Sequence, residues 1–241
     1  MNHLSFVVCV NNRDTLRRCL LASPCIARVD YALTQFEGCS SAAEAFNAAL
    51  QTARSTWLVF VHQDVFLPQG WDQQFLEGIK AAWQQFKELA VVGVYGVQRN
   101  PSSATQQNIH VGHVLDRGRL LKAETPLPAR ADTLDELCFA VRCDSGLRLD
   151  AALGFDFYAA DIALQAVEQG FSVVVVDAYC EHHSSLPRRG FSEAFVERFG
   201  ASATVFQKKW QHRLPISTPC ITLTADSAAE IQVRAAAGQV A

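Results

Sequence analysis

The stretch Trp57-Leu-Val-Phe-Val-His-Gln-Asp64 places five consecutive apolar residues directly before three polar ones. A short, continuous apolar run is typical of a strand that is covered on both faces of a sheet. A helical pattern over residues 42–53 precedes this strand, and another follows the break at Pro68-Gln69-Gly70. Strands that alternate with helices through short connections predict an α/β domain, with a mostly parallel central sheet flanked by helices.

Further elements extend this pattern in both directions. Additional strands are predicted at residues 4–10, 29–33, 91–97, 137–141 and 171–177, and a further helix at 158–169. Residues 98–130 are polar and irregular apart from a hairpin signal at Asp116-Arg117-Gly118. Because no Pro/Gly/Ser-rich linker divides the chain, we predict one domain over residues 1–212. The Ala- and Gln-rich residues 213–241 are predicted to form a loosely ordered C-terminal tail.

The composition excludes several classes of protein. A net charge of −3 argues against a nucleic-acid partner, because nucleic-acid binding requires a basic stripe. No apolar run reaches the length of a transmembrane segment, and the N-terminus lacks the features of a secretory signal. The eight cysteines include no Cys-x-x-Cys pair, so we expect free thiols, several of them buried, and a cytoplasmic location.

Polar residues cluster at the positions where this fold binds ligands. In open α/β sheets, ligands bind beyond the carboxyl ends of the strands. Carboxylate oxygens and imidazole nitrogens at such ends are ligands for Mg²⁺ or Mn²⁺. The candidates at this edge are Asn11-Asn12, His62-Gln63-Asp64, Asp135-Glu136 and His182-His183, together with Asp161 in the first turn of its helix.

Each candidate also has a purely structural interpretation. Asp64 can accept backbone hydrogen bonds in the turn before Pro68. Asp161 lies in the first turn of a helix, where the helix dipole favours any acidic residue. His182 and His183 can be surface residues at a strand end. The residue types alone therefore do not decide between a ligand site and these structural roles.

The order of the motifs resembles a known family. Residues 57–68 end a strand where that family has Asp-x-Asp, and residues 181–184 resemble its late metal-binding His. The other matching segments are an opening strand and helix at 6–20, an Asn-containing helix at 45–53 and an acceptor-side Glu-Asp motif at 157–164. Over roughly residues 4–212 the chain resembles family-two glycosyltransferases with the A-type fold, the nucleotide-diphospho-sugar transferase fold.

The resemblance implies an inverting glycosyltransferase that depends on Mn²⁺ or Mg²⁺. Its donor is a nucleotide-diphosphate sugar, with a UDP-sugar favoured, and its acceptor is a glycan or glycolipid. The implied catalytic base is Asp161, and the implied metal ligands are Asp64, His182 and His183. The implied donor-binding residues are Val10, Asn11, Asn12, Gln35, Glu37, Asn47, His62, Gln63, Asp64, Asp135 and Glu136. Such a role is also compatible with peripheral attachment at the inner membrane face.

Departures from the family pattern favour one alternative. His62 replaces the first acid of Asp-x-Asp, Ala160 replaces the Glu beside Asp161, and Val10-Asn11-Asn12 replaces Pro-x-Tyr-Asn. The alternative is a non-catalytic nucleotide-sugar or carbohydrate-binding module on the same fold. A nucleotidyltransferase or a dinucleotide-dependent oxidoreductase would need a Gly-rich loop after the first strand, and the sequence has none there.

The segment after the His pair is basic. Arg188 and Arg189 could close over a bound diphosphate as a lid, because guanidinium groups form paired hydrogen bonds to phosphate. On sequence alone, a solvated basic loop is the favoured interpretation of these two residues.

Overall fold

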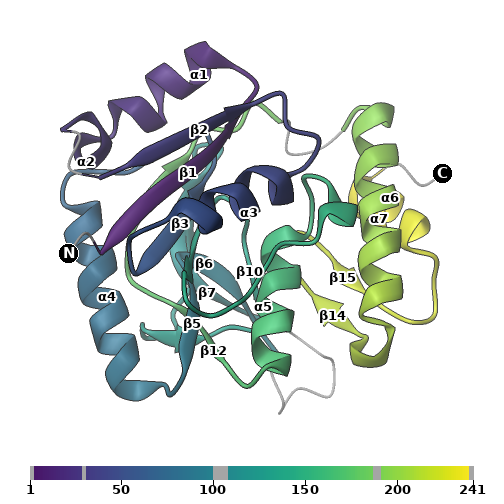
Figure 1. Cartoon of the computed structure of the whole chain (residues 1–241). Helices are drawn as coiled ribbons and strands as arrows, with labels where there is room; N and C mark the ends of the chain where they lie inside the picture. Colours follow the sequence, from purple (N-terminus) through teal and green to yellow (C-terminus); the bar gives the residue numbers. More distant parts are fainter. Residues whose placement is uncertain (1–2, 29–30, 100–107, 187–190, 239–241) are drawn as a thin grey trace.

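The computed structural model describes residues 3–28, 31–99, 108–186 and 191–238, and Arg188 and Arg189 lie outside these ranges (Figure 1). Within the described residues, the largest sheet has seven strands in the order β2-β1-β3-β11-β5-β12-β9. Their bounds are β1 Leu4–Val10, β2 Leu33–Glu37, β3 Trp57–Val61, β5 Leu89–Gly93, β9 Ala129–Arg130, β11 Cys138–Arg142 and β12 Ser172–Val175.

The strand directions decide which residues share the functional edge of this sheet. Strand β1 is parallel to β2 and β3, and β12 is parallel to β5. Strand β11 lies between β3 and β5 and is antiparallel to both. The prediction of a mostly parallel sheet flanked by helices is confirmed. Because β11 runs backwards, the residues that precede it lie at the same edge as the residues that follow β3.

Helices cover both faces of the sheet because side chains alternate along each strand. One face packs against α1 (Arg13–Arg18), α2 (Pro24–Ala27) and α4 (Trp71–Gln85). Leu4, Phe6 and Val8 of β1 point to this side. The opposite face packs against α3 (Ala42–Thr52) and α5 (Tyr158–Glu168). The two apolar layers hold the strand ends rigidly in place.

A second sheet lies beside the first, with the strand order β10-β6-β7-β13-β4. Strand β8 pairs with β7 through a turn at Arg117 and Gly118, whose φ angles of 48° and 73° are the positive values that a type I′ hairpin requires. The hairpin predicted at this position is confirmed. The bounds are β4 Val65–Phe66, β6 Tyr95–Gln98, β7 Ile109–Asp116, β8 Arg119–Lys122, β10 Thr133–Leu134 and β13 Cys180–His182.

Several strand boundaries differ from the sequence prediction. The apolar run 91–97 divides into β5 of the first sheet and β6 of the second, and the strand predicted at 171–177 ends at Val175. The strand predicted at 29–33 begins only at Leu33, where pairing with Phe6 starts, and Val29 lies outside the described residues. Backbone pairing with a neighbouring strand determines where each strand begins and ends. Apolar composition alone does not show where that pairing starts or stops.

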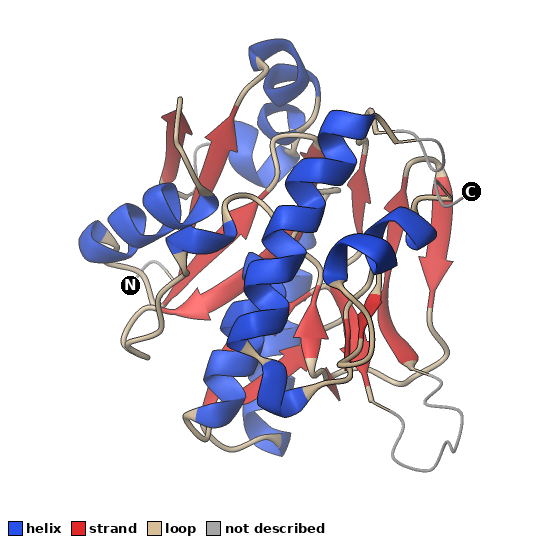
Figure 2. Ribbon diagram, turned by 90° about the vertical axis from the view of Figure 1, so that its right-hand side faces the viewer, coloured by secondary structure: helices blue, strands red, loops and turns tan. Residues whose placement is uncertain are grey.

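The C-terminal residues 213–238 are packed, although the sequence predicts a loosely ordered tail. They form a hairpin of β14 (Ile216–Ser217) and β15 (Thr222–Leu223), followed by α7 (Ala229–Ala236). Helix α7 packs against α6 (Glu193–Lys209), and Figure 2 shows the long α6 and the shorter α7 on the same side of the molecule. The physical reason is a narrow apolar stripe with four-residue spacing, formed by Ala229, Val233 and Ala237, which is buried against α6.

The cysteines and the lengths of the apolar helices can be compared with what the composition predicts. The eight cysteines are all free, and Cys19, Cys25, Cys138 and Cys180 are buried. Among the residues that the structure describes, no helix is both long enough and apolar enough to cross a membrane.

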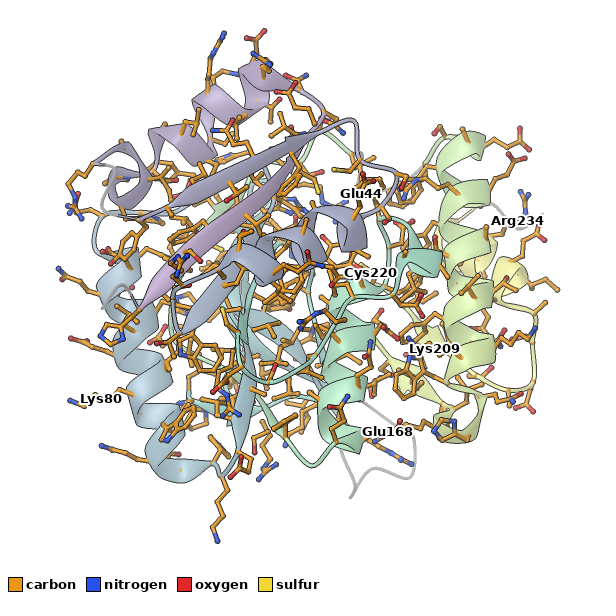
Figure 3. All side chains as sticks on the ribbon, in the orientation of Figure 1. Glu44, Lys80, Glu168, Lys209, Cys220 and Arg234 are labelled. Atoms are coloured by element: carbon orange, nitrogen blue, oxygen red, sulfur yellow. The ribbon has the colours of Figure 1, made fainter. Side chains whose placement is uncertain are left out.

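A buried carboxylate joins α5 to the end of α6. Asp161 is completely buried, its Oδ1 accepts a hydrogen bond from Trp210 Nε1 at 2.8 Å, and its Oδ2 accepts one from Lys209 Nζ at 3.0 Å. Gln165 Nε2 donates to Oδ2 at 2.6 Å. Lys209 lies between α5 and the C-terminal helices and also pairs with Asp150 at 2.7 Å (Figure 3). Asp161 therefore fixes the C-terminal helices onto the domain.

We predict that Asp161→Ala destabilises the protein by about 1–3 kcal/mol, because it leaves the buried Trp210 donor without its acceptor and removes one partner of the partly exposed Lys209. The free energy of unfolding in urea measures this loss. The matched control is Glu168→Ala on the same helix, whose partner His212 is exposed, with an expected loss below roughly 1 kcal/mol. Equal losses in the two variants would contradict the structural role of Asp161.

Candidate active site

The turn after β3 connects the two sheets. The backbone N–H of His62 donates to Leu137 O at 3.0 Å, and the N–H of Val65 donates to His62 O at 3.2 Å. The chain thus leaves the first sheet at Val61 and enters the second as β4 at Val65. The three intervening residues, 62–64, point their polar groups into the junction between the sheets.

Strand β13 brings His182 to this turn. His182 lies opposite Val65 of β4 on one side and opposite Asp116 of β7 on the other. The backbone N–H of His183 donates to Asp64 O at 2.8 Å. Three segments that are far apart in the sequence therefore meet at one point.

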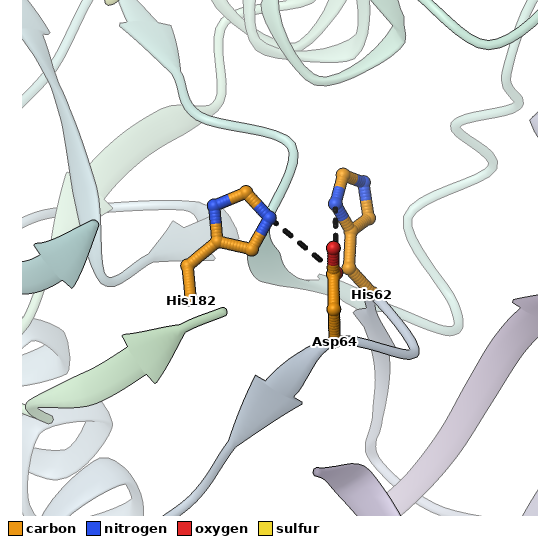
Figure 4. Close-up of side chains that lie close together, drawn as sticks. All are labelled: His62, Asp64 and His182. Carbon is orange, nitrogen blue, oxygen red and sulfur yellow. Dashed lines mark ion pairs between the residues drawn. The ribbon is translucent and has the colours of Figure 1, made fainter. Parts of the chain in front are cut away.

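His62, Asp64 and His182 form a compact group of ligand atoms (Figure 4). Asp64 Oδ1 lies 3.4 Å from His182 Nε2 and 4.0 Å from His62 Nδ1. The three ligand atoms all lie within 4.8 Å of one another, and the side chains are partly buried. One carboxylate oxygen and two imidazole nitrogens could hold a divalent cation, and this set fits Mn²⁺ better than Mg²⁺, which prefers oxygen ligands.

The neighbouring charges determine the protonation states in this group. Burial lowers the pKa of His62 to about 4, with a smaller contribution from His182 in the same direction. Burial alone would raise the pKa of Asp64, but hydrogen bonding and charge from His182 and His62 lower it to about 2. Burial also opposes the charged form of His182, but hydrogen bonds to Asp116 and Asp64 raise its pKa to about 10. At neutral pH, Asp64 is ionised and His62 is neutral, so both have free electron pairs for a cation, whereas His182 must release a proton.

A pocket of about 410 Å³ adjoins this group at the end of β1. Gln63 Oε1 accepts hydrogen bonds from the backbone N–H groups of Asn11 at 3.1 Å and Asn12 at 3.0 Å. Asn12 also caps α1 by accepting a hydrogen bond from Thr15 N at 2.9 Å. The structure thus brings together four of the predicted donor-binding residues. The pocket is lined by Asn11, Asn12, Thr15, Arg18, Cys19, Gln63, Asp64, His183 and Ser185.

Other predicted donor-binding residues lie around the end of β1 and along β2. Val10 is buried as the last residue of β1. Gln35 and Glu37 are exposed on β2, and Glu37 forms an exposed ion pair with Arg13 at 2.9 Å. None of these three lines the pocket at the end of β1 within the described residues.

Two predicted site residues have structural roles instead. Asn47 Nδ2 donates to Leu149 O at 2.9 Å, and Asn47 Oδ1 accepts from Leu149 N at 3.0 Å. This amide is occupied by backbone groups, so the structure gives no support for a contact with the donor.

Asp161, the predicted base, is buried beneath Lys209 and Trp210 and offers no accessible oxygen to an acceptor. Sequence patterning could not reveal either set of partners, because they lie far away along the chain.

The predicted metal ligand His183 does not join His62, Asp64 and His182. Its side chain is 45% exposed and bonds to Glu181 at 3.1 Å. Adjacent residues of a strand point to opposite faces, so only one histidine of the pair can face Asp64. The structure assigns this position to His182.

Two acidic residues lie at the same edge because β11 runs antiparallel to β3. Asp135 and Glu136 lie in the connection between β10 and β11, and Asp135 Oδ1 accepts a hydrogen bond from Leu137 N at 3.0 Å. Burial raises the pKa of Asp135 and raises that of Glu136 well above the ordinary glutamate value. The Glu136 carboxylate accepts the backbone N–H of Tyr158 at the start of α5. Both are partly accessible carboxyl groups with a raised proton affinity.

The sequence analysis did not identify two residues that contact the histidines of this group. Asp116 Oδ1 lies 2.9 Å from His182 Nδ1, and Tyr158 OH lies 2.7 Å from His62 Nε2. The only sequence signal at Asp116 is the hairpin that follows it, and Tyr158 reads as a core residue of its helix. Both contacts depend on long-range packing.

An α/β sheet with a polar pocket and a candidate metal site at the carboxyl ends of its strands is the architecture of an A-type glycosyltransferase. The family model described as "Glycosyltransferase like family" matches residues 5–194, and the chain belongs to this family.

The individual proteins to which the chain is similar share less than a third of its residues. The chain is 28% identical over 138 residues to "ATP synthase subunits region ORF 6" of Fuscovulum blasticum, covering 56% of this chain and 54% of that one. It therefore spans about half the length of this curated relative. A solved mannosyltransferase from Pyrobaculum calidifontis, in complex with GDP-Man and Mn²⁺, has a TM-score of 0.53 at 13% identity, covering 87% of this chain and 64% of that one. TarS of S. aureus, in complex with UDP-GlcNAc, has a TM-score of 0.46 at 13% identity, covering 86% and 67%.

We predict that Asp64→Ala and His182→Ala abolish Mn²⁺ binding, because each removes one of the three ligand atoms that converge. Isothermal titration of Mn²⁺ into the purified protein measures this. His183→Ala is the matched control, since His183 is adjacent in the sequence but bonds to Glu181 instead of Asp64. Loss of binding in His183→Ala with retention in His182→Ala would reverse the assignment.

Proposed function

We propose that this chain is a metal-dependent, inverting glycosyltransferase that moves a sugar from a nucleotide-diphosphate sugar to an acceptor hydroxyl. The observation that carries the proposal is the meeting of His62, Asp64 and His182 beside the pocket at the end of β1. Membership of the glycosyltransferase-like family supports the same reaction class.

The pocket offers the groups that a nucleotide diphosphate needs. Asn11, Asn12 and Gln63 line the pocket at the strand end, where their amides are held by one another and by backbone groups, and Arg18 adds a positive charge. A divalent cation held by Asp64, His182 and His62 would neutralise negative charge on the leaving diphosphate. Asp64 is a constant anionic ligand for such a cation, because its pKa of about 2 keeps it ionised at neutral pH.

Inversion requires one carboxylate that accepts the proton of the acceptor hydroxyl during its attack on the anomeric carbon. Asp161 cannot do this, because it is buried and paired. We assign the role to Glu136, which lies at the N-terminus of α5 and at the same sheet edge as Asp64. Its raised pKa makes it a stronger base than an exposed glutamate.

The donor nucleotide remains to be chosen by experiment. The sequence resemblance favours a UDP-sugar, whereas the Pyrobaculum calidifontis mannosyltransferase is in complex with GDP-Man and Mn²⁺. Likeness at 13% identity is a likeness of fold, so it carries no preference for the base.

A second candidate function is binding without turnover. The observation that favours it is the burial of Asp161 by Lys209 and Trp210, at the motif where the family resemblance implies a catalytic acid. A chain that binds a nucleotide sugar with Mn²⁺ but never releases free nucleotide would be such a module.

We predict that either UDP or GDP binds only when Mn²⁺ is present, and that Asp64→Ala abolishes this binding. In our proposal Asp64 would hold the cation, and the cation would supply the positive charge that the diphosphate needs, so the nucleotide without the cation should not bind. Calorimetric titration of each nucleotide, with and without Mn²⁺, measures the effect. Nucleotide binding that is equally strong in Asp64→Ala would contradict the donor site.

We predict that Glu136→Gln lowers kcat for release of nucleotide from the bound nucleotide sugar by about 10²–10⁴-fold, with donor affinity retained. Because burial raises the pKa of Glu136, kcat in the wild type should rise as the pH increases above the usual glutamate range, and Glu136→Gln should lose this dependence. Asp135→Asn is the neighbouring control, since its Oδ1 is held by Leu137 N. A larger loss in Asp135→Asn would move the role to Asp135.

A further inference from the structure

The side of His182 that faces away from Asp64 is bound to a second carboxylate. Asp116, the last residue of β7, lies directly opposite His182 in the pairing of β7 with β13. Its Oδ1 is 2.9 Å from His182 Nδ1, and its other oxygen, Oδ2, accepts a hydrogen bond from Arg117 Nε at 2.9 Å. Both side chains are mostly buried, with 18% of Asp116 and 16% of His182 exposed.

This contact fixes which nitrogen of the ring faces the proposed cation. His182 Nε2 lies 3.4 Å from Asp64 Oδ1, whereas Nδ1 is occupied by Asp116. A ring turned by half a rotation would lose the hydrogen bond to Asp116 and would present a carbon atom towards Asp64. The backbone supports the same arrangement, since Arg117 N donates to His182 O at 3.0 Å.

We propose that Asp116 is a positioning residue that orients His182 so that it binds the cation through Nε2. The inference rests on the metal-dependent function proposed above. A histidine that binds a metal is neutral and donates its other N–H to a fixed acceptor, and loss of that acceptor typically weakens metal binding by about 10–100-fold. Asp116 supplies this acceptor, and Arg117 holds its second oxygen in place.

The isosteric variant Asp116→Asn gives a sharper test than truncation. In the wild type, Arg117 Nε donates to one oxygen of Asp116 and His182 Nδ1 meets the other. In Asp116→Asn, the single remaining oxygen is drawn to the Arg117 donor, so the amide NH₂ faces Nδ1. That arrangement favours the ring with its proton on Nε2, which cannot bind a cation. The variant keeps the shape of the site and changes only the hydrogen-bond direction.

The experiment measures the Mn²⁺ dissociation constant of the full chain by isothermal titration for the wild type, Asp116→Asn and Asp116→Ala. We expect both variants to bind about 10–100-fold more weakly. The matched control is Asp177→Asn, because Asp177 also pairs with a histidine, His113 at 3.4 Å, but outside the group of His62, Asp64 and His182. Its Mn²⁺ affinity should equal that of the wild type.

A second readout follows the ring itself. In the wild type loaded with diamagnetic Zn²⁺ in place of the paramagnetic Mn²⁺, proton–nitrogen NMR of the histidine rings should show His182 protonated at Nδ1 and bound through Nε2, and Asp116→Asn should lose this pattern. Wild-type Mn²⁺ binding that persists unchanged in both Asp116 variants would overturn the positioning role and leave the proposed function standing. A wild-type chain that binds no Mn²⁺ would overturn the proposed metal site and the positioning role together.

Discussion

The site depends on the pairing of one short strand. Strand β13 is bonded to β4 on one side and to β7 on the other, and these two ladders bring His182 beside Asp64 and Asp116. The hydrogen bond from His183 N to Asp64 O adds a further constraint on the turn after β3. Asp64, Asp116 and His182 are separated by 52 and 66 positions along the chain, so only this strand pairing brings them into contact. The location of the site at the junction of two sheets follows from this pairing.

Charge balance in the site favours a cation. Asp64, Asp116 and Asp135 all act on His182, and the hydrogen bonds to Asp116 and Asp64 raise its pKa to about 10 despite burial. Burial raises the pKa of Asp135, whereas the charge of His182 acts in the opposite direction. The proton on His182 therefore partly compensates the acidic groups around it. A divalent cation held at the same place would do so more strongly, because it carries two charges.

The sequence predicted the parts of the site that follow from local pattern. An apolar run followed by polar residues identified β3 and the turn with His62 and Asp64. The rule that ligands bind at carboxyl strand ends selected Asp135-Glu136 and His182-His183, without separating the two histidines. The fold class followed from the alternation of strands and helices. The burial of Asp161 could not be predicted, because it depends on Trp210 at the end of α6, next to a segment whose Ala-rich composition conceals a packed helix. Asp116 was missed because only the pairing of β7 with β13 reveals its partner.

The substitution of His62 for an acid has a physical explanation in this structure. Tyr158 OH lies 2.7 Å from Nε2 of the ring, which leaves Nδ1 facing Asp64. Burial keeps the ring neutral at physiological pH, so the site has one negative charge fewer than an Asp-x-Asp pair would give it. A second imidazole nitrogen also makes the ligand set softer and shifts its preference from Mg²⁺ towards Mn²⁺. The departure from the family motif therefore leaves a group of ligand atoms that could still hold a divalent cation.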